Sequence, residues 1–376
     1  MDTSIDLIPV RSGFDGKWFW GQARAGAIPG VDGGNPTVVL TAQPALRSGS
    51  DVYYALSEWR TSDFGTSWEG PRAHEETLGR RREEDGVEVA ICDMEPEWHA
   101  GSGRLLSTGH SVGYRNDAEP MIARRREPVY SVYDKATATW TPWDIVSLPE
   151  VPEFENAGAG SAQRFDLEDG TILLPIYHKP ISEDWHASNF STVLRCSFDG
   201  EKLSYLEHGN SLSAPDPRGM CEPSLTRVGS MFYLTLRNDV RGYVATSEDG
   251  LHFGEPVPWR FDDGSELGNY NTQQHWITHG GRLFLVYTRK GLNNDHVFRH
   301  RAPLVMAEVD PERLVVIRTS EREVIPNRGA RLGNFSVCPV TESETWVVVA
   351  EWMQPEGCEA YGCNNTIWAA RIRWVD

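Results

Sequence analysis

Short apolar segments alternate with polar turns along most of the chain. Six of them have the pattern of a turn followed by a strand: residues 36–40, 103–107, 169–177, 229–237, 281–287 and 344–350. Most are rich in β-branched or aromatic residues and are bounded by Gly, Asp or Ser, which is typical of β-strands that end in tight turns. No segment longer than two turns has a helical period. The pattern predicts an all-β protein.

A turn built around aspartate recurs between these segments. Its clearest copy is Thr61-Ser62-Asp63-Phe64-Gly65-Thr66-Ser67-Trp68, where the Asp side chain accepts amide hydrogen bonds, the glycine permits positive φ and the Trp covers the turn. Weaker copies are centred on Asp134, Asp199, Asp249 and Asp310. The five aspartates are separated by 71, 65, 50 and 61 residues, a spacing that suits four-stranded blades of about 40–50 residues with insertions.

We therefore predict one domain, residues 1–376, that is a six-bladed β-propeller with four antiparallel strands per blade. Residues 366–374 read as a strand of the last blade, and N-terminal residues are expected to close the ring. Closing the ring removes exposed sheet edges.

The turn at residues 61–68 resembles the Asp box, or BNR repeat, of the sialidase (neuraminidase) superfamily, and the six-unit pattern resembles its six-bladed propeller. The resemblance implies an active site at one end of the central channel, lined by the first strands of the blades. The family's glutamate, followed about fifteen residues later by an arginine, is matched by Glu222 and Arg237. Its next arginine is matched by Arg299 or Arg301.

Two features of the family pattern are missing. The Arg-Ile-Pro motif corresponds to Ala27-Ile28-Pro29, which lacks the arginine, and the tyrosine nucleophile aligns with Phe335. A phenyl ring cannot attack an anomeric carbon, and a bidentate arginine clamp on a carboxylate is not easily replaced. The sequence thus argues against cleavage of sialic acid by the sialidase mechanism.

Polar and aromatic residues are concentrated in residues 269–276 and in the segment from Tyr287 to Arg301. Amide and guanidinium groups bind sugar hydroxyls, and aromatic faces bind the ring. A surface loop with ordinary capping residues is the alternative. The substrate-binding residues we predict are Tyr177, His178, Arg237, Gln273, Arg289, Arg299, His300 and Arg301.

A second polar cluster consists of Asp93, Glu95 and Glu97. Alternate positions on a strand share one face, so these carboxylates are expected to point together into the channel. Crowding raises one pKa and leaves another low, which suits an acid and a base. A solvent-facing acidic edge is the alternative. The catalytic residues we predict are Asp93, Glu95, Glu222, His275 and Tyr287.

We expect no cofactor and no metal ligands, although a divalent metal stays open as an alternative. Its candidate ligands are His178, His275, His296 and His300, with Gln273 or Gln274 as an oxygen ligand. No HExxH-type signature fixes their geometry. The six scattered cysteines are interpreted as buried thiols, with Cys358 and Cys363 as a less favoured metal clip.

The formal net charge of −18 and the pI near 5.1 argue against nucleic acids and anionic membranes as partners. The arginine runs at residues 80–82 and 124–126 are each followed by acidic residues and are interpreted as solvated loops. No apolar segment resembles a signal peptide or a membrane span, so a cytoplasmic location is expected. The oligomeric state is left open.

These features favour a glycosidase of carbohydrate metabolism that acts on a short oligosaccharide, with Glu222 and Asp93 or Glu95 as acid and base. One alternative is a lyase on uronic-acid-containing glycans that uses His275 or His300 with Tyr177 or Tyr287. The other is a sugar-binding propeller without catalysis.

Overall fold

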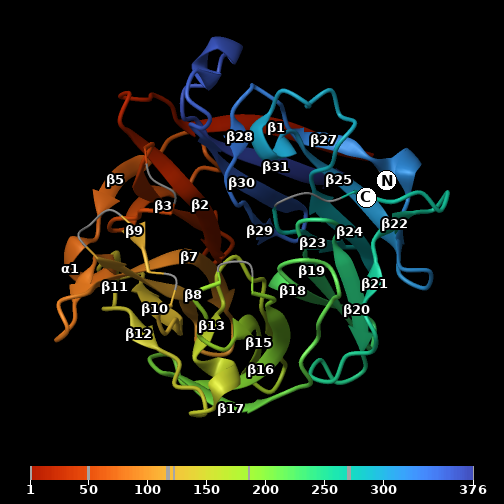
Figure 1. Cartoon of the computed structure of the whole chain (residues 1–376). Coiled ribbons are helices and arrows are strands. Elements are labelled where there is room, and N and C mark those ends of the chain that lie inside the picture. The colour runs from red at the N-terminus through yellow and green to blue at the C-terminus, as the bar shows by residue number, and fades with distance from the viewer. Residues whose placement is uncertain are drawn as a thin grey trace.

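Six antiparallel sheets surround a central axis in the computed structural model (Figure 1). The structure describes residues 2–48, 51–115, 119–121, 123–184, 187–268 and 272–375. The chain passes once around the ring, from the red first blade to the blue last one. The predicted six-bladed propeller of four-stranded blades is confirmed.

Each blade begins with its innermost strand and adds later strands outward. The first is formed by β2 (Trp18–Ile28), β3 (Thr37–Leu46), β4 (Ser57–Thr61) and β5 (Glu69–Ala73). The second is formed by β7 (Glu88–His99), β8 (Arg104–Arg115), β10 (Pro128–Asp134) and β11 (Thr139–Trp140), with the short β6 (Arg81–Arg82), β9 (Glu119–Pro120) and β12 (Asp144–Ile145). The third is formed by β13 (Asn156–Gly158), β14 (Phe165–Asp166), β15 (Thr171–Lys179), β16 (Phe190–Phe198) and β17 (Leu203–His208).

The last three blades follow the same order. The fourth is formed by β18 (Cys221–Val228), β19 (Met231–Arg237), β20 (Tyr243–Ser247) and β21 (Val257–Pro258). The fifth is formed by β23 (His275–His279), β24 (Arg282–Tyr287), β25 (Leu304–Asp310) and β26 (Val315–Val316), with β22 (Arg260–Phe261) and β27 (Arg322–Ile325) at its edge. The sixth is formed by β28 (Arg331–Leu332), β29 (Ser336–Thr341), β30 (Glu344–Trp352), β31 (Ile367–Val375) and β1 (Asp2–Arg11).

Helical structure is confined to single turns. These are α1 (Glu75–Leu78) and the 3₁₀ segments η1 (Pro152–Phe154), η2 (Phe298–His300), η3 (Arg318–Ser320) and η4 (Cys358–Tyr361). Within the described part of the chain, no helix has the length and apolar character needed to cross a membrane.

The two ends of the chain share the last blade. Strand β1 pairs antiparallel with β31 from Asp2 opposite Val375 to Arg11 opposite Ile367, and the two lie side by side in Figure 1. The predicted closure by N-terminal residues is therefore confirmed, and β1 covers the edge that β31 would otherwise expose.

Apolar side chains fill the spaces between neighbouring blades. Leu40 and Trp59 of the first blade pack with Val348 and Ala369 of the sixth, all of them buried. Comparable clusters lie at the other blade interfaces. The six cysteines are free thiols, and all are buried.

The five predicted turn aspartates lie between the third and fourth strands of the first five blades. Each accepts backbone amide hydrogen bonds from residues two to four positions on. In the first copy, the Ser67 hydroxyl and amide donate to Asp63, at 2.6 and 3.0 Å. These bonds lower the pKa of Asp63 to about 2.

Candidate functional site

The inner strands of several blades carry the same irregularity. The register with the second strand shifts between Gly21 and Arg24, between Cys92 and Glu95, and between Cys221 and Ser224. Within these shifts Gln22, Asp93 and Glu222 have φ of 53°, 54° and 45°. Ser161, between β13 and β14, has φ of 53°. Such strained β-bulges redirect side chains and gather at functional sites.

Gln22, Asp93, Ser161 and Glu222, the four residues with the positive φ values given above, come from four blades and bring their polar side chains to one end of the channel. Arg24 Nη2 donates to Gln22 Oε1 at 3.3 Å, to Asp93 Oδ1 at 2.8 Å and to Ser161 Oγ at 2.7 Å. The charge of Glu222 adds to burial in raising the pKa of Asp93. We take this end of the channel as the candidate site.

Glu222 forms a buried ion pair with Arg237, the two residues that the resemblance matched to the family pattern. Arg237 Nη1 donates to both carboxylate oxygens, at 2.7 and 2.6 Å, and the two residues are 6% and 2% exposed. Burial opposes ionisation of Glu222, but Arg237 and Arg218 outweigh it and lower its pKa. Glu222 is therefore a carboxylate at neutral pH.

Further arginines surround this pair. Arg218 Nη1 donates to Asp239 at 2.9 Å, and Arg237 reaches the same carboxylate at 3.2 Å. Burial and the charges of neighbouring arginines lower the pKa of Arg299 and of Arg301, and they lower that of Arg331 to about 10. Several guanidinium groups therefore lie close together around Glu222 in a strongly acidic protein.

Tyr177 also lies at this end of the channel. Arg126 Nη1 donates to its hydroxyl at 3.2 Å, the guanidinium lies 4.4 Å from the ring centroid, and the hydroxyl is 3.5 Å from His110 Nδ1. The interpretation of residues 124–126 as a solvated loop is therefore wrong for Arg126, which packs against Tyr177.

Asp51 is a carboxylate that the sequence reasoning missed. Its Oδ1 accepts from the Tyr53 hydroxyl at 2.9 Å, and that hydroxyl accepts from Gln22 Nε2 at 2.8 Å. Its charge acts on both Arg299 and Arg331. Unlike Asp93 and Glu222, Asp51 is only half-buried. Asp51 lies in a loop between β3 and β4. Because a loop has no alternation of apolar and polar residues, the sequence pattern did not identify it.

Arg24 separates Asp93 and Glu95 from bulk solvent. Its Nη2 is 2.8 Å from Asp93 Oδ1, and its Nε is 2.9 Å from Glu95 Oε2. Burial outweighs the attraction to Arg24 and raises the pKa of Glu95 to about 8, and burial outweighs the attraction to Arg164 and raises the pKa of Glu97 to about 7. The pKa values of all three carboxyl groups therefore rise, whereas the lowered one belongs to Glu222. The catalytic roles of Asp93 and Glu95 stay predictions.

Ala27 and Ile28, where the resemblance placed the missing arginine, lie at the far end of β2. The arginine of β2 that reaches Asp93 is Arg24, three residues before Ala27. Arg24 is fully buried and already engaged by two carboxylates, so it is not available as a clamp for substrate.

His275 and Gln273 line the channel beside Phe335. The His275 ring lies 2.7 Å from the Ser224 hydroxyl and 3.1 Å from the Phe335 carbonyl, which also accepts from Gln273. Burial and the charge of Arg24 lower the pKa of His275 to about 3. His275 is therefore neutral and held in a structural network.

Three predicted site residues belong to other networks. The Tyr287 hydroxyl donates to Glu321 at 2.6 Å. The Arg289 guanidinium donates to the same carboxylate at 2.8 and 2.5 Å. His178 lies 3.0 Å from both the Glu153 carbonyl and the Ser211 hydroxyl. None of these contacts joins them to Glu222 or Arg237. His300 follows Arg299 in η2, and its carbonyl accepts from Thr288.

The predicted histidine metal set does not converge in the described part of the chain. The only group of three His, Cys, Asp or Glu side chains suitable for a metal there is Cys92, Asp93 and His110. Residues 269–271 of the polar stretch lie outside the described residues.

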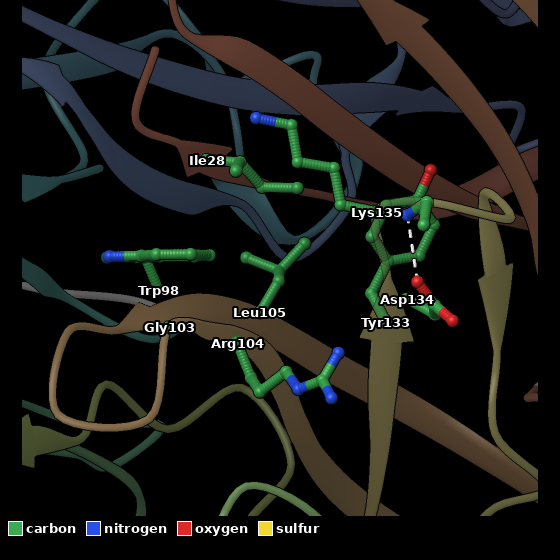
Figure 2. Close-up of a pocket in the computed structure, with 9 residues that line it drawn as sticks. Ile28, Trp98, Gly103, Arg104, Leu105, Tyr133, Asp134 and Lys135 are labelled. Carbon is green, nitrogen blue, oxygen red and sulfur yellow. Dashed lines mark hydrogen bonds between the residues drawn. The ribbon is translucent and has the colours of Figure 1, made fainter. Parts of the chain in front are cut away.

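A separate cavity of about 450 Å³ is lined by residues of the first and second blades (Figure 2). It is lined by Ile28, Trp98, Leu105 and Tyr133 among others. Ile28 ends β2, and Trp98 comes five positions after the Asp93 bulge. The cavity contains none of the predicted site residues. The polar side chains that the bulges gather lie instead at the arginine-rich end.

Solved structures with this fold are sialidases and trans-sialidases. Trypanosoma rangeli sialidase in complex with the inhibitor DANA is 13% identical with a TM-score of 0.61, and the match covers 99% of this chain and 60% of that one. The leech intramolecular trans-sialidase is 12% identical with a TM-score of 0.63, covering 94% and 68%. The Ruminococcus gnavus intramolecular trans-sialidase is 12% identical with a TM-score of 0.59, covering 94% of both chains.

The chain thus spans about three fifths of the length of the trypanosomal enzyme. No protein-family profile and no curated protein matches its sequence. The structural similarity shows that the chain has the six-bladed propeller fold of the sialidase superfamily, as the Asp-containing turn indicated.

Proposed function

We propose that this protein is a sialidase-like glycoside hydrolase that acts on a short oligosaccharide containing an acidic sugar other than sialic acid. The observation that carries the proposal is the buried Glu222–Arg237 pair within a group of further arginines, Arg218, Arg299, Arg301 and Arg331. Guanidinium groups bind carboxylates and sulfates in bidentate geometry. An acidic sugar would place its negative charge among these guanidinium groups.

Glu222 and Asp51 are the carboxylates we assign to the reaction. Because its pKa is low, Glu222 is ionised and suited to stabilise the positive charge at the anomeric carbon or to activate water. Asp51, half-buried and hydrogen-bonded by Tyr53, is the proposed proton donor to the leaving group. A water molecule takes the place of the tyrosine nucleophile, since Phe335 has no reactive group.

A panel of acidic and neutral oligosaccharides tests the proposal, with reducing-end release as the readout. Turnover is expected on uronate-containing or sulfated saccharides, and Glu222→Gln and Asp51→Asn should each lower kcat by about 10²–10⁴-fold. Glu321→Gln is the matched control, because Glu321 also pairs with a partly buried arginine, but in another network. Full activity of Glu222→Gln, or turnover of neutral saccharides alone, would contradict the proposal.

A uronate lyase is the second candidate, favoured by the contacts of Tyr177. Its hydroxyl lies between Arg126 and His110, where a tyrosine can transfer a proton at C5 while an arginine neutralises the carboxylate. Burial raises the pKa of Tyr177, and Arg126 opposes this. Lysis leaves a double bond that absorbs in the ultraviolet, and Tyr177→Phe should abolish that signal. Reducing ends without ultraviolet absorbance exclude the lyase.

A further inference from the structure

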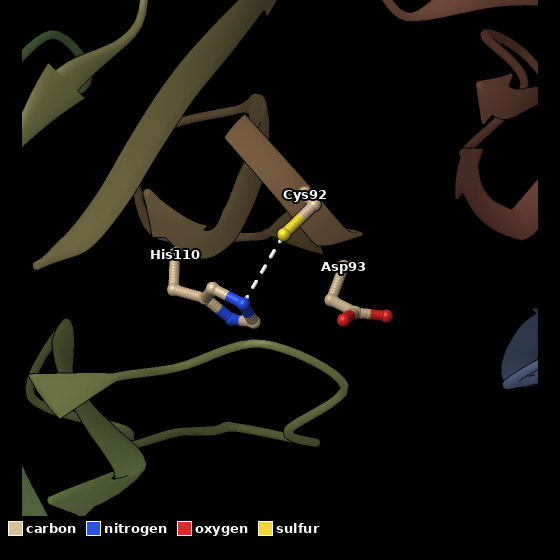
Figure 3. A group of neighbouring side chains, drawn as sticks. All are labelled: Cys92, Asp93 and His110. Atoms are coloured by element: carbon tan, nitrogen blue, oxygen red, sulfur yellow. Dashed lines mark hydrogen bonds between the residues drawn. The ribbon is translucent and has the colours of Figure 1, made fainter. Parts of the chain in front are cut away.

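Three potential metal ligands from two neighbouring strands lie close together (Figure 3). Cys92 and Asp93 are consecutive on β7, and His110 lies opposite Cys92 on β8. Cys92 Sγ is 3.1 Å from His110 Nε2, and the donor atoms of all three residues lie within 4.8 Å of one another. All three side chains are buried.

The bulge in β7 makes this arrangement possible. Consecutive residues of a regular strand point to opposite faces, so Cys92 and Asp93 would normally diverge. The register shift between Cys92 and Glu95, with φ of 54° at Asp93, turns both side chains to the same side. Strain of this kind persists where the surrounding structure enforces it.

The hydrogen bonds of Asp93 leave one carboxylate oxygen for a ligand. Arg24, Ser161 and Asn334 all donate to Oδ1, at 2.8, 2.8 and 3.3 Å. Among the described residues, no hydrogen bond reaches Oδ2. Outer partners of this kind orient the ligating carboxylates of metal sites.

The His110 ring is fixed in the same manner. Its Nε2 faces Cys92, while Nδ1 is 3.5 Å from the Tyr177 hydroxyl. A Cβ at Gly160 would lie 1.9 Å from Nδ1, and one at Gly158 would lie 2.7 Å from the His110 Cβ. Only glycine at these positions allows the backbone to pack against the imidazole, which holds Nε2 toward the other two ligands.

The ligand types of the three side chains suit a soft divalent cation. An imidazole nitrogen can donate a lone pair, and a thiolate and a carboxylate together would cancel the charge of a divalent ion, which lets the ion lie near Arg24 and Arg126. A thiol ligand disfavours Mg²⁺ and Ca²⁺ and favours Zn²⁺.

We propose that Cys92 Sγ, Asp93 Oδ2 and His110 Nε2 form a binding site for Zn²⁺ or another thiophilic divalent cation. Sulfur and nitrogen ligands on one tetrahedral zinc are about 3.5 Å apart, so Cys92 and His110 need to separate by only a few tenths of an ångström. Binding releases the thiol proton to solvent. Asp93 then serves as a ligand and not as the acid predicted from the sequence.

Metal binding is tested directly on the full chain after chelator treatment. Titration with Co²⁺ should give a thiolate-to-cobalt absorption band that saturates at one ion per chain, and Zn²⁺ should displace it. Cys92→Ser and His110→Ala should weaken binding by at least about 100-fold. Cys196→Ser, a buried thiol in the third blade, is the matched control and should leave the titration unchanged. Cys358→Ser checks the remote Cys358/Cys363 pair.

Two results would overturn the site: a cobalt titration that is unchanged in Cys92→Ser, or a signal that disappears in Cys358→Ser instead. If the ligand variants do not fold, X-ray absorption of the zinc-loaded wild type decides, with one sulfur and otherwise nitrogen or oxygen neighbours expected. An absence of sulfur refutes the proposal. None of these readouts requires turnover, so the metal site and the proposed hydrolase can fail independently.

Discussion

The Glu222–Arg237 pair allows a prediction about charge balance in the axial cavity. Glu222→Gln removes a negative charge and leaves Arg237 buried among Arg218, Arg299, Arg301 and Arg331. Breaking a buried ion pair on one side costs about 3–5 kcal/mol of unfolding free energy. Arg237→Gln should cost less than half as much, because Arg218 and Arg301 still face Glu222 and because one source of repulsion is removed.

Thermal unfolding and urea titration measure this difference. An unfolding entropy of about 2.1 cal/mol/K per residue over 376 residues is about 0.8 kcal/mol/K, so Glu222→Gln should lower Tm by about 4–6 °C and Arg237→Gln by about half that or less. The lowered pKa of Glu222 means that the ion pair stabilises the fold above about pH 4.5, the ordinary value, and that this stability is lost as the pH falls. The gap between wild type and Glu222→Gln should therefore close in acid.

An added anion provides the control. A saturating uronate or sulfate at 100 times its Kd should restore about 2.7 kcal/mol to whichever protein binds it, and Glu222→Gln should gain at least as much as wild type. If the two variants lose equal unfolding free energy, or if Arg237→Gln loses more, the reasoning that the neighbouring arginines repel Arg237 is refuted.

Three further results are expected from other parts of the molecule. The raised pKa of Glu95 makes the unfolding free energy of the wild type fall as pH rises from about 4.5 to about 8. Urea titrations of Glu95→Gln should therefore show a pH dependence that is flatter than that of the wild type by up to about 1.4 kcal/mol per pH unit. An unchanged slope would mean that Glu95 is ionised throughout. Gly160→Ala should destabilise the fold by about 1–3 kcal/mol in urea titration because its Cβ would meet His110, and a smaller loss would show that the ring moves freely. Removal of residues 2–11 should expose the edge of β31 and cause concentration-dependent association by light scattering, whereas a monodisperse product would show that the edge is otherwise protected.

The blade architecture was predictable because its signals are local. Asp63 and Asp249 mark turns through bonds to amides only a few residues away, and the apolar strands between them have a short period. Glu222 and Arg237 were matched to the family pattern through their separation across one hairpin, but their pairing with each other was seen only in the structure.

The rest of the site depends on features that periodicity does not encode. Arg24 reads as an ordinary strand residue until the bulge at Gln22 directs it to Asp93. Asp51 lies in a loop, and Cys92 meets His110 only through the pairing of β7 with β8. Conversely, Tyr287 and Arg289 were predicted to bind sugar because they are aromatic and polar, yet both side chains donate hydrogen bonds to Glu321. Sequence composition identifies such residues without showing which partner each one takes.

The pairing of β1 with β31 has a consequence for how the chain folds. The first ten described residues gain their partners only after a strand more than 350 positions later has emerged. During synthesis five blades can assemble in order before this segment finds its partner, and the ring cannot close until residues 367–375 have been synthesised. Contacts of such long sequence separation slow folding. Blade six should therefore acquire protection from hydrogen exchange last during refolding.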